Sequence, residues 1–184
     1  VILDLTDNLL LHSAVVEAPV AGSRAAMLII GDPGAGKSTL AMYMTRAGCR
    51  LCGDDLALLQ WEGRIQAVPF PATLKAGSWS LLAASEVTVA EGDLTRNINQ
   101  TRSYLRPDAQ HVRYLPLADA RGAVPESLPV RWVVFLDRVS EPVDCPVATP
   151  LDVPDALSRM IAASWSGTED LEPAEFQALA ACLD

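Results

Sequence analysis

The chain has 184 residues, half of them hydrophobic and a fifth charged, and its formal net charge is −9. This length and composition suit one globular unit with a sizeable core, so we expect residues 1–184 to form a single domain. Nucleic-acid binding is disfavoured, because the sequence has no Lys/Arg-rich run to displace counterions from phosphates. No apolar run reaches the roughly 20 residues that span a bilayer, so we expect no membrane partner.

The N-terminal residues lack the basic start and the cleavage site of a secretory signal, so we expect a cytoplasmic protein. The chain begins at Val1 rather than Met, and we expect native N-terminal residues to be missing. Cys49 and Cys52 form a C-x-x-C pair, but no second pair of zinc ligands accompanies them. We therefore expect buried, free thiols.

The first half of the chain predicts strands on either side of one helix. Residues 9–18 are apolar and partly alternating, which indicates a strand, and residues 25–31 indicate a buried strand. Residues 37–48 predict a helix that stops at Gly48. Residues 49–61 and 64–70 predict two strands that form a hairpin.

The second half is less regular. The polar run over residues 91–108 predicts a loop. Residues 112–117 and 130–137 predict two strands, and two helices follow them. We expect the apolar faces of both helices to belong to the core; these faces comprise Val153, Leu157, Met160, Ile161 and Trp165 in the first helix, and Phe176, Leu179, Ala180 and Leu183 in the second. The fold class is therefore mixed α/β.

A phosphate-binding loop is the most specific motif in the sequence. Residues 31–38 match G-x-x-x-x-G-K-[ST], and the match lies between a hydrophobic strand and a helix, as this motif requires. Glycines let backbone N–H groups turn toward phosphate oxygens, and the helix N-terminus adds partial positive charge. The expected nucleotide-binding residues are Gly31, Asp32, Pro33, Gly34, Ala35, Gly36, Lys37, Ser38 and Thr39.

Within this loop, Lys37 would reach the outer phosphates and the Ser38 hydroxyl would bind Mg²⁺. Two acids, Asp54 and Asp55, follow only one short helix later, between apolar residues. We expect the chain to return toward the phosphates there, provided that the strand ends or bends at Gly53. Two carboxylates suit phosphoryl transfer, with Asp54 as the base and Asp55 on the metal side.

The run from Gly31 to Leu59 resembles the core of the HPr kinase/phosphorylases and of shorter HPr kinase-related serine kinases. It is also similar to the nucleotide site of phosphoenolpyruvate carboxykinases. The resemblance implies a P-loop domain with a mixed sheet and flanking helices, and an ATP- and Mg²⁺-dependent kinase. It matches His12 to the family's histidine on the strand before the loop, which adds His12 to the expected catalytic residues Lys37, Asp54 and Asp55.

The same resemblance allows a homo-oligomer. The chain lacks the Glu-Arg-Gly signature of the HPr kinase/phosphorylases, so HPr itself and a reverse reaction are not implied. Phosphoryl transfer also favours a further cation near the developing charge. Lys75 is the first choice because its "LKAGSW" setting resembles the related kinases; the other candidates are Arg96, Arg102, Arg106 and Arg113. His111 is interpreted as structural, and Trp79 as a possible wall of a substrate pocket.

Three functions stay open from these residues. The favoured one is a kinase that phosphorylates a hydroxyl, with a serine of a peptide or small protein as acceptor. A kinase of a small metabolite would use the same machinery. A regulatory module that binds ATP without chemistry is the third, but it has less need of a base.

Overall fold

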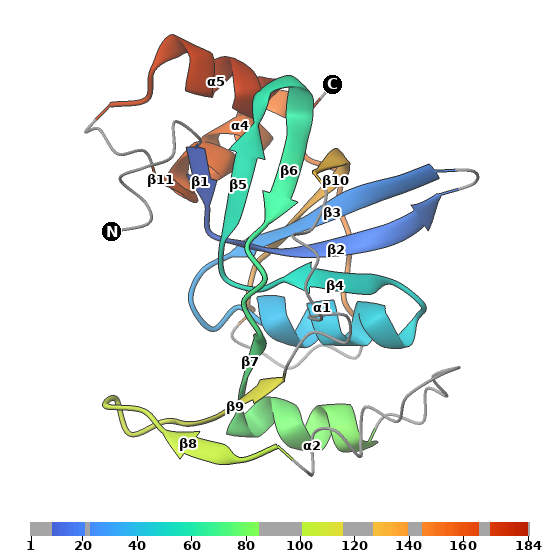
Figure 1. The fold of residues 1–184 in the computed structure, drawn as a ribbon, viewed down its shortest axis with the longest axis vertical. Coiled ribbons are helices and arrows are strands. Elements are labelled where there is room, and N and C mark those ends of the chain that lie inside the picture. Colours follow the sequence, from blue (N-terminus) through green and yellow to red (C-terminus); the bar gives the residue numbers. More distant parts are fainter. Residues whose placement is uncertain are drawn as a thin grey trace.

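The computed structural model describes residues 9–20, 23–84, 101–115, 127–139, 145–165 and 170–183 (Figure 1). Over these residues the chain forms one eight-stranded sheet, one three-stranded sheet and a few helices. Strand β10 runs parallel to β3, whereas the other pairings of the large sheet are antiparallel. The expected mixed α/β architecture with a mixed sheet is therefore confirmed.

The large sheet has the strand order β11-β1-β5-β6-β10-β3-β2-β4. Its strands are β1 (Leu9–Leu11), β2 (Ser13–Val20), β3 (Ser23–Gly31), β4 (Arg50–Gly53), β5 (Ala57–Gln60), β6 (Arg64–Ala67), β10 (Leu128–Leu136) and β11 (Ser164–Trp165). The predicted β5–β6 hairpin is present, joined by the 3₁₀ turn η2 (Trp61–Gly63). The parallel pair β3–β10 brings the carboxyl ends of both strands to the same edge of the sheet.

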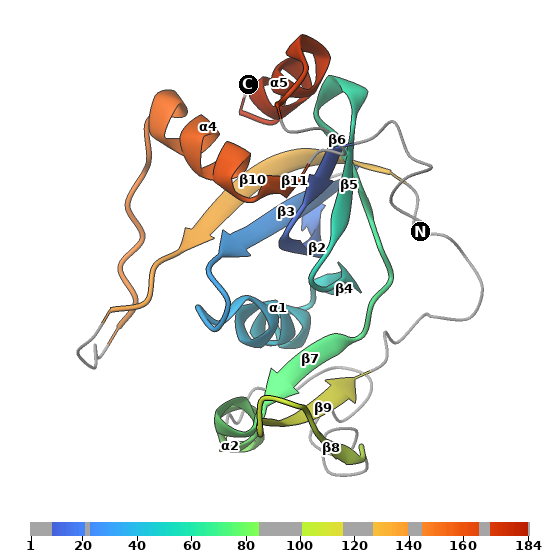
Figure 2. The ribbon, with the colours of Figure 1, turned by 90° about the vertical axis from the view of Figure 1, so that its left-hand side faces the viewer.

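Helices cover both faces of this sheet. Helix α1 (Lys37–Arg46) lies between the large and the small sheet, and α4 (Val153–Ala162) and α5 (Pro173–Ala180) lie on the opposite side (Figure 2). Alternating side chains of β2 and β3 serve the two layers: Ala14, Val16 and Ile29 pack with Ala41 of α1, whereas Val15, Leu28 and Ile30 pack in the cluster that contains Met160 and Leu179. Each fully buried aliphatic side chain contributes about 1.5–3 kcal/mol.

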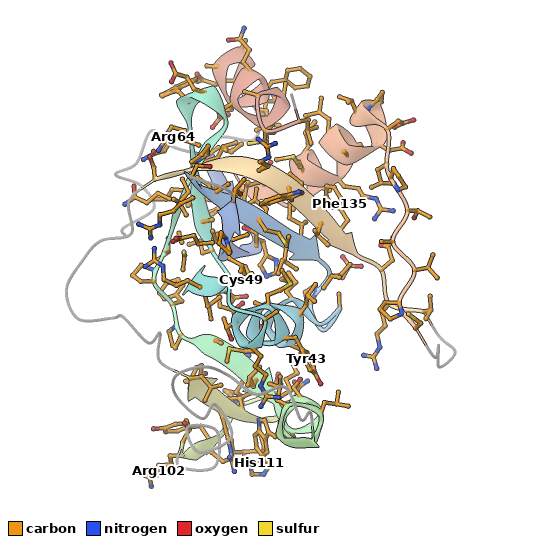
Figure 3. All side chains as sticks on the ribbon, turned by 90° about the vertical axis from the view of Figure 1, so that its right-hand side faces the viewer. Tyr43, Cys49, Arg64, Arg102, His111 and Phe135 are labelled. Carbon is orange, nitrogen blue, oxygen red and sulfur yellow. The ribbon has the colours of Figure 1, made fainter. Side chains whose placement is uncertain are left out.

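The small sheet stands beyond α1 (Figure 1). It has the order β7-β9-β8, with β7 (Ala72–Lys75), β8 (Ser103–Leu105) and β9 (His111–Leu115), and α2 (Ala76–Ala84) follows β7 directly. Tyr43 lies on the side of α1 that faces α2, and its hydroxyl donates to the Leu81 carbonyl over 3.0 Å (Figure 3). This contact connects α1 to α2, the helix that follows strand β7 of the small sheet.

The polar run over residues 91–108 was expected to be a loop throughout, and this is wrong at β8. Residues 91–100 lie outside the described part. Ser103–Leu105 pairs with β9, and the rings of Tyr104 and Tyr114 meet at a centroid distance of 5.8 Å. A cross-strand aromatic contact stabilises a short hairpin that local composition does not indicate.

Two strands predicted as continuous are each divided. The first breaks at His12, where the chain changes neighbours: β1 pairs with β5 and β11, but β2 pairs with β3 and β4. At the break, the His12 backbone N–H donates to the Ala163 carbonyl over 2.8 Å. The second strand breaks at Asp54 and Asp55, between β4 and β5. Both interruptions fall at residues expected to be catalytic.

The C-terminal helices are less buried than expected. Met160 and Leu179 are in the core, but Val153 and Phe176 are exposed, and Ile161 lies at the surface. Helix α4 ends at Ala162, so Trp165 is not helical; it belongs to the short edge strand β11 and is 57% exposed. Helix α4 begins after Asp152, whose side chain accepts from the Asp155 N–H as an N-cap.

Candidate phosphate-loop site

The glycine-rich segment forms a tight loop between the end of β3 and the start of α1 (Figure 2). Gly34 and Gly36 adopt φ values of 91° and 110°, in the left-handed region where other residues are strained. Gly31 is needed for a different reason: a Cβ there would lie 2.8 Å from the Leu136 carbonyl of β10. The glycines therefore set both the turn and the close approach of the neighbouring strand.

The loop presents unused backbone donors. No described side chain caps the N-terminus of α1, and the N–H groups of Gly34, Gly36, Lys37 and Ser38 have no acceptor in the described part of the chain. Added Cβ atoms at Gly34 and Gly36 would meet no backbone, so the space in front of them is open. Free amides at a helix N-terminus are suited to an anion.

Lys37 lies against the first residues of this loop. Its side chain is buried, and Nζ donates to the carbonyls of Gly31 over 2.8 Å and Asp32 over 3.4 Å. Burial lowers the pKa of Lys37, whereas the nearby carboxylates of Asp55, Asp54 and Asp32 act in the opposite direction. The ammonium group is thus held beside the loop and among acids, where a phosphate could replace its carbonyl contacts.

The two acids reach this loop because β4 stops at Gly53. A Cβ at Gly53 would lie 2.1 Å from the Val68 carbonyl, so only glycine allows the chain to pass there. Asp55 then adopts a φ of 76°, a conformation that is uncommon for a residue other than glycine. This turn removes both acids from the strand's alternation and directs them to different partners.

Asp54 faces the loop. It is only 1% exposed, and its Oδ2 atom accepts from Ser38 Oγ over 2.8 Å and from the Thr73 backbone N–H over 2.9 Å. Burial raises the pKa of Asp54, and the Thr73 and Ser38 hydrogen bonds oppose this rise. Ser38 and Asp54, the expected metal-binding hydroxyl and the expected base, are therefore in direct contact.

Asp55 faces outward and meets His12. The carboxylate is 68% exposed, and its Oδ1 atom lies 3.1 Å from His12 Nε2. The interrupted strand before the loop and the interrupted strand after α1 thus place two expected catalytic residues in contact, although 43 positions separate them. The acids of the two pairs, Asp54 with Ser38 and Asp55 with His12, are adjacent residues of one turn.

The oxygen donors beside the loop suit a divalent cation. Asp54 Oδ1 is buried and has no hydrogen-bond partner in the described residues, so one carboxylate oxygen is left for a ligand beside the Ser38 hydroxyl. Oxygen donors of this kind suit Mg²⁺. The described residues contain no cluster of three or more His, Cys, Asp or Glu side chains.

Among the candidate cations that lie in the described residues, Lys75 is the one at the loop. Its Nζ atom lies 4.0 Å from the position of a Cβ at Gly34, and its charge contributes to the lowered pKa of Lys37. Lys75 is the last residue of β7, two residues after Thr73, whose backbone N–H donates to Asp54. Strand β7 therefore supplies both a cation and a backbone donor to the site.

The other candidates lie elsewhere. Arg113 stacks on the Trp79 ring at 4.4 Å, and Trp79 Nε1 donates to the Leu74 carbonyl, so both belong to the packing of the small sheet. His111 lies at the start of β9, with Nδ1 3.4 Å from Ser103 Oγ, which agrees with a structural role. Arg102 and Arg106 are exposed at this sheet, and Arg96 lies outside the described residues.

A pocket of about 250 Å³ opens beside the first residues of the loop, at the carboxyl ends of β3 and β10. Its apolar wall consists of Ile30, Phe135, Leu136, Ala162 and Ala163. Its polar lining consists of His12, Asp32, Asp137 and Arg159. Phe135 lies on the face of β10 toward α4, with the Arg159 guanidinium 5.5 Å from its ring (Figure 3). The pocket shares His12 and Gly31 with the site.

Sequence reasoning missed Thr73, Asp137 and Arg159. Thr73 acts through its backbone, which carries no sequence signal. Arg159 Nη1 donates to both Asp137 carboxylate oxygens, at 3.0 and 2.9 Å, and joins α4 to the end of β10. The position of Asp137 at the end of a buried strand was the available signal, because ligands often bind there in α/β folds.

All four cysteines are free; Cys52 is buried as expected, whereas Cys49 is only partly buried. Within the described residues no helix is long and apolar enough to cross a membrane.

No family model matches the sequence, and no curated protein matches it either.

Proposed function

We propose that this protein is an ATP- and Mg²⁺-dependent kinase of the HPr kinase-related type, which transfers the γ-phosphoryl group to a hydroxyl. The favoured acceptor is a serine of a peptide or small protein. The observation that carries the proposal is the 2.8 Å hydrogen bond from Ser38 Oγ to Asp54 Oδ2, because it joins the uncapped glycine loop to the acid pair. A glycine turn with only a structural role has no need of a buried carboxylate against its hydroxyl.

The roles of the two acids follow from their contacts, in the reverse of the order expected from the sequence. Asp54 is buried against Ser38 and suits the metal side, where P-loop enzymes use a Ser/Thr hydroxyl with an aspartate. Asp55 is exposed beside His12, where an acceptor can approach it. We assign Asp55 as the base and His12 as the residue that orients its carboxylate.

The chain's residues would then share the reaction as follows. The amides of the loop and Lys37 hold the outer phosphates, and Lys75 adds a second positive charge at Gly34. Asp55 accepts the proton of the acceptor hydroxyl. The hydroxyl oxygen forms a bond to the γ-phosphorus, and the bond to the bridging oxygen breaks with its electrons leaving on ADP. Mg²⁺, when bound beside Ser38 and Asp54, neutralises charge on the phosphates.

The first experiment measures nucleotide binding by calorimetry, with and without Mg²⁺, and transfer from γ-labelled ATP to pools of serine peptides. We expect Mg²⁺-dependent binding, lost in Lys37→Met and kept in the control Arg131→Met, whose side chain is exposed on β10. Lys75→Gln should weaken binding several-fold without unfolding the protein, because Lys75 is exposed. Wild-type protein that binds no Mg·ATP would refute the proposal.

A kinase of a small metabolite is a second candidate, favoured by the volume of the pocket beside His12. At about 250 Å³ it is smaller than the 300–1,000 Å³ of pockets for drug-sized ligands. The same assay with a pool of small hydroxyl compounds in place of peptides distinguishes the two. Tight ATP binding with neither transfer nor hydrolysis would instead indicate a regulatory ATP-binding module.

A further inference from the structure

We infer that the pocket between β3, β10 and α4 binds the phosphoryl acceptor, and that it selects acceptors with a cationic group next to the hydroxyl. This inference rests on the proposed kinase function and names the substrate class of that site. The juxtaposition that carries it is the position of the pocket. The pocket is lined by His12, which contacts the proposed base Asp55, and by Gly31 of the phosphate loop. It extends away from the loop toward Asp137 and Arg159.

The position of the pocket fits an acceptor better than a nucleotide. His12 contacts Asp55 across the site and lines the pocket, so a group seated there has its neighbouring hydroxyl next to the proposed base. The backbone of His12 is fixed to the end of α4 by the 2.8 Å bond to Ala163. The volume accommodates a small molecule or a side chain rather than a nucleoside triphosphate.

The charge of the lining favours a cation. Two carboxylates, Asp32 and Asp137, line the pocket with one guanidinium, Arg159, so the formal charge is −1 when His12 is neutral. Asp137 is 72% exposed although it pairs with Arg159, so its oxygens are open to a second partner. A bound nucleotide would add further negative charge at the adjoining loop. An ammonium or guanidinium group is attracted by this field, whereas a carboxylate or phosphate is repelled.

The apolar wall sets the remaining requirement. Phe135, Leu136 and Ala162 form one side of the pocket, so the hydrocarbon part of the acceptor lies against them and its charge lies at the Asp137 rim. Lysine next to serine in a peptide, and a small hydroxyl-bearing amine, both have this chemistry.

The test compares phosphoryl transfer to three peptides of the form Ala-Xaa-Ser-Xaa-Ala, with Xaa as Lys, Gln or Glu, and to ethanolamine. We expect wild-type protein to favour a cationic acceptor over the Glu peptide by about two- to fivefold, the range that a partly exposed ion pair supports. Transfer to the Lys peptide alone, or to ethanolamine alone, supports the inference and identifies the source of the cation.

Variants locate the effect. Ala162→Trp should block the pocket and reduce transfer at least tenfold with an unchanged Kd for Mg·ATP, and Ser158→Trp, an exposed position of α4 that does not line the pocket, should not. Asp137→Asn should reduce the preference for a cation, and Arg159→Gln should increase it, because the formal charge of the lining changes in opposite directions.

The failures of the two proposals are distinguishable. Wild-type protein that does not bind Mg·ATP contradicts the kinase function. Wild-type protein that binds Mg·ATP but transfers equally to the Lys and Glu peptides, or to none of the four acceptors, overturns the inference about the pocket. Equal transfer by Ala162→Trp and Ser158→Trp overturns it as well.

Discussion

Replacing Asp54 tests how the acid pair is built into the fold. Its Oδ2 atom accepts both the Ser38 and the Thr73 hydrogen bonds, whereas Oδ1 has no partner in the described residues. In Asp54→Asn the amide oxygen can keep both bonds while the NH₂ group takes the position of Oδ1. In Asp54→Ala both bonds are lost and the two donors lose their acceptor.

The magnitude follows from these contacts. Neither variant carries a charge, so their difference reports the two hydrogen bonds without the cost of burying a carboxylate. A part-buried donor left without an acceptor costs about 1–3 kcal/mol. Two such donors cost about 2–6 kcal/mol, and the Asn NH₂ group, buried at the Oδ1 position without an acceptor in the described residues, offsets about 1–3 kcal/mol of this, so we expect Asp54→Ala to be about 1–3 kcal/mol less stable than Asp54→Asn. Urea unfolding at pH 7, followed by circular dichroism, measures the free energies of unfolding.

Wild-type protein adds a pH dependence whose sign is fixed. Burial raises the pKa of Asp54 in the folded state, so its contribution to stability is greatest at low pH and is lost as the pH rises through the folded pKa. Compared with Asp54→Asn, wild-type protein should therefore become less stable as the pH increases from 4 to 7. Equal stabilities of the Asn and Ala variants, or the opposite pH trend, would refute this description of the site.

Three further predictions concern other parts of the site and the fold. Asp55→Asn should reduce transfer at least about 100-fold, as expected for loss of a general base, and leave the Kd for Mg·ATP within twofold; an equal loss of binding would contradict the base role. Gly53→Ala should lower the free energy of unfolding by about 1–3 kcal/mol, because its Cβ would lie 2.1 Å from the Val68 carbonyl. Urea unfolding measures this change, and a wild-type midpoint would contradict this packing. The hydrogen bonds from Arg24 and Arg50 lower the pKa of Glu17 in the folded state. The difference in unfolding free energy between wild type and Glu17→Gln should therefore shrink as the pH falls below about 4.5, and a difference that grows would contradict these ion pairs.

The local parts of the site could be predicted from the sequence. The glycine pattern, Lys37 and Ser38 lie within eight residues, and a strand before them and a helix after them are visible in the hydrophobic pattern. The sequence predicted one strand over residues 49–61, and a break at Gly53 was only the condition for both acids to reach the loop; β4 does end there. These features depend on backbone conformations that a few neighbouring residues determine.

The contacts that assign roles could not be predicted. His12 meets Asp55 because β1 pairs with β5 and β2 pairs with β4, and Arg159 meets Asp137 because α4 lies beside the end of β10. Strand order is a tertiary property, since local pattern gives the strands but not their neighbours. The predicted burial of the α4 face was wrong for a related reason: Val153 has helical spacing with Met160, but the large sheet covers only part of that helix, and Trp165 lies beyond its end in β11.

A crystal structure with Mg²⁺ and a non-hydrolysable ATP analogue tests the central claim most directly. We expect the triphosphate on the amides of residues 34–38, the cation beside Ser38 and Asp54, and Asp55 within one water molecule of the γ-phosphate's open side. A nucleotide bound away from the loop, or acids beyond the reach of a bridging water, would contradict the proposed kinase site.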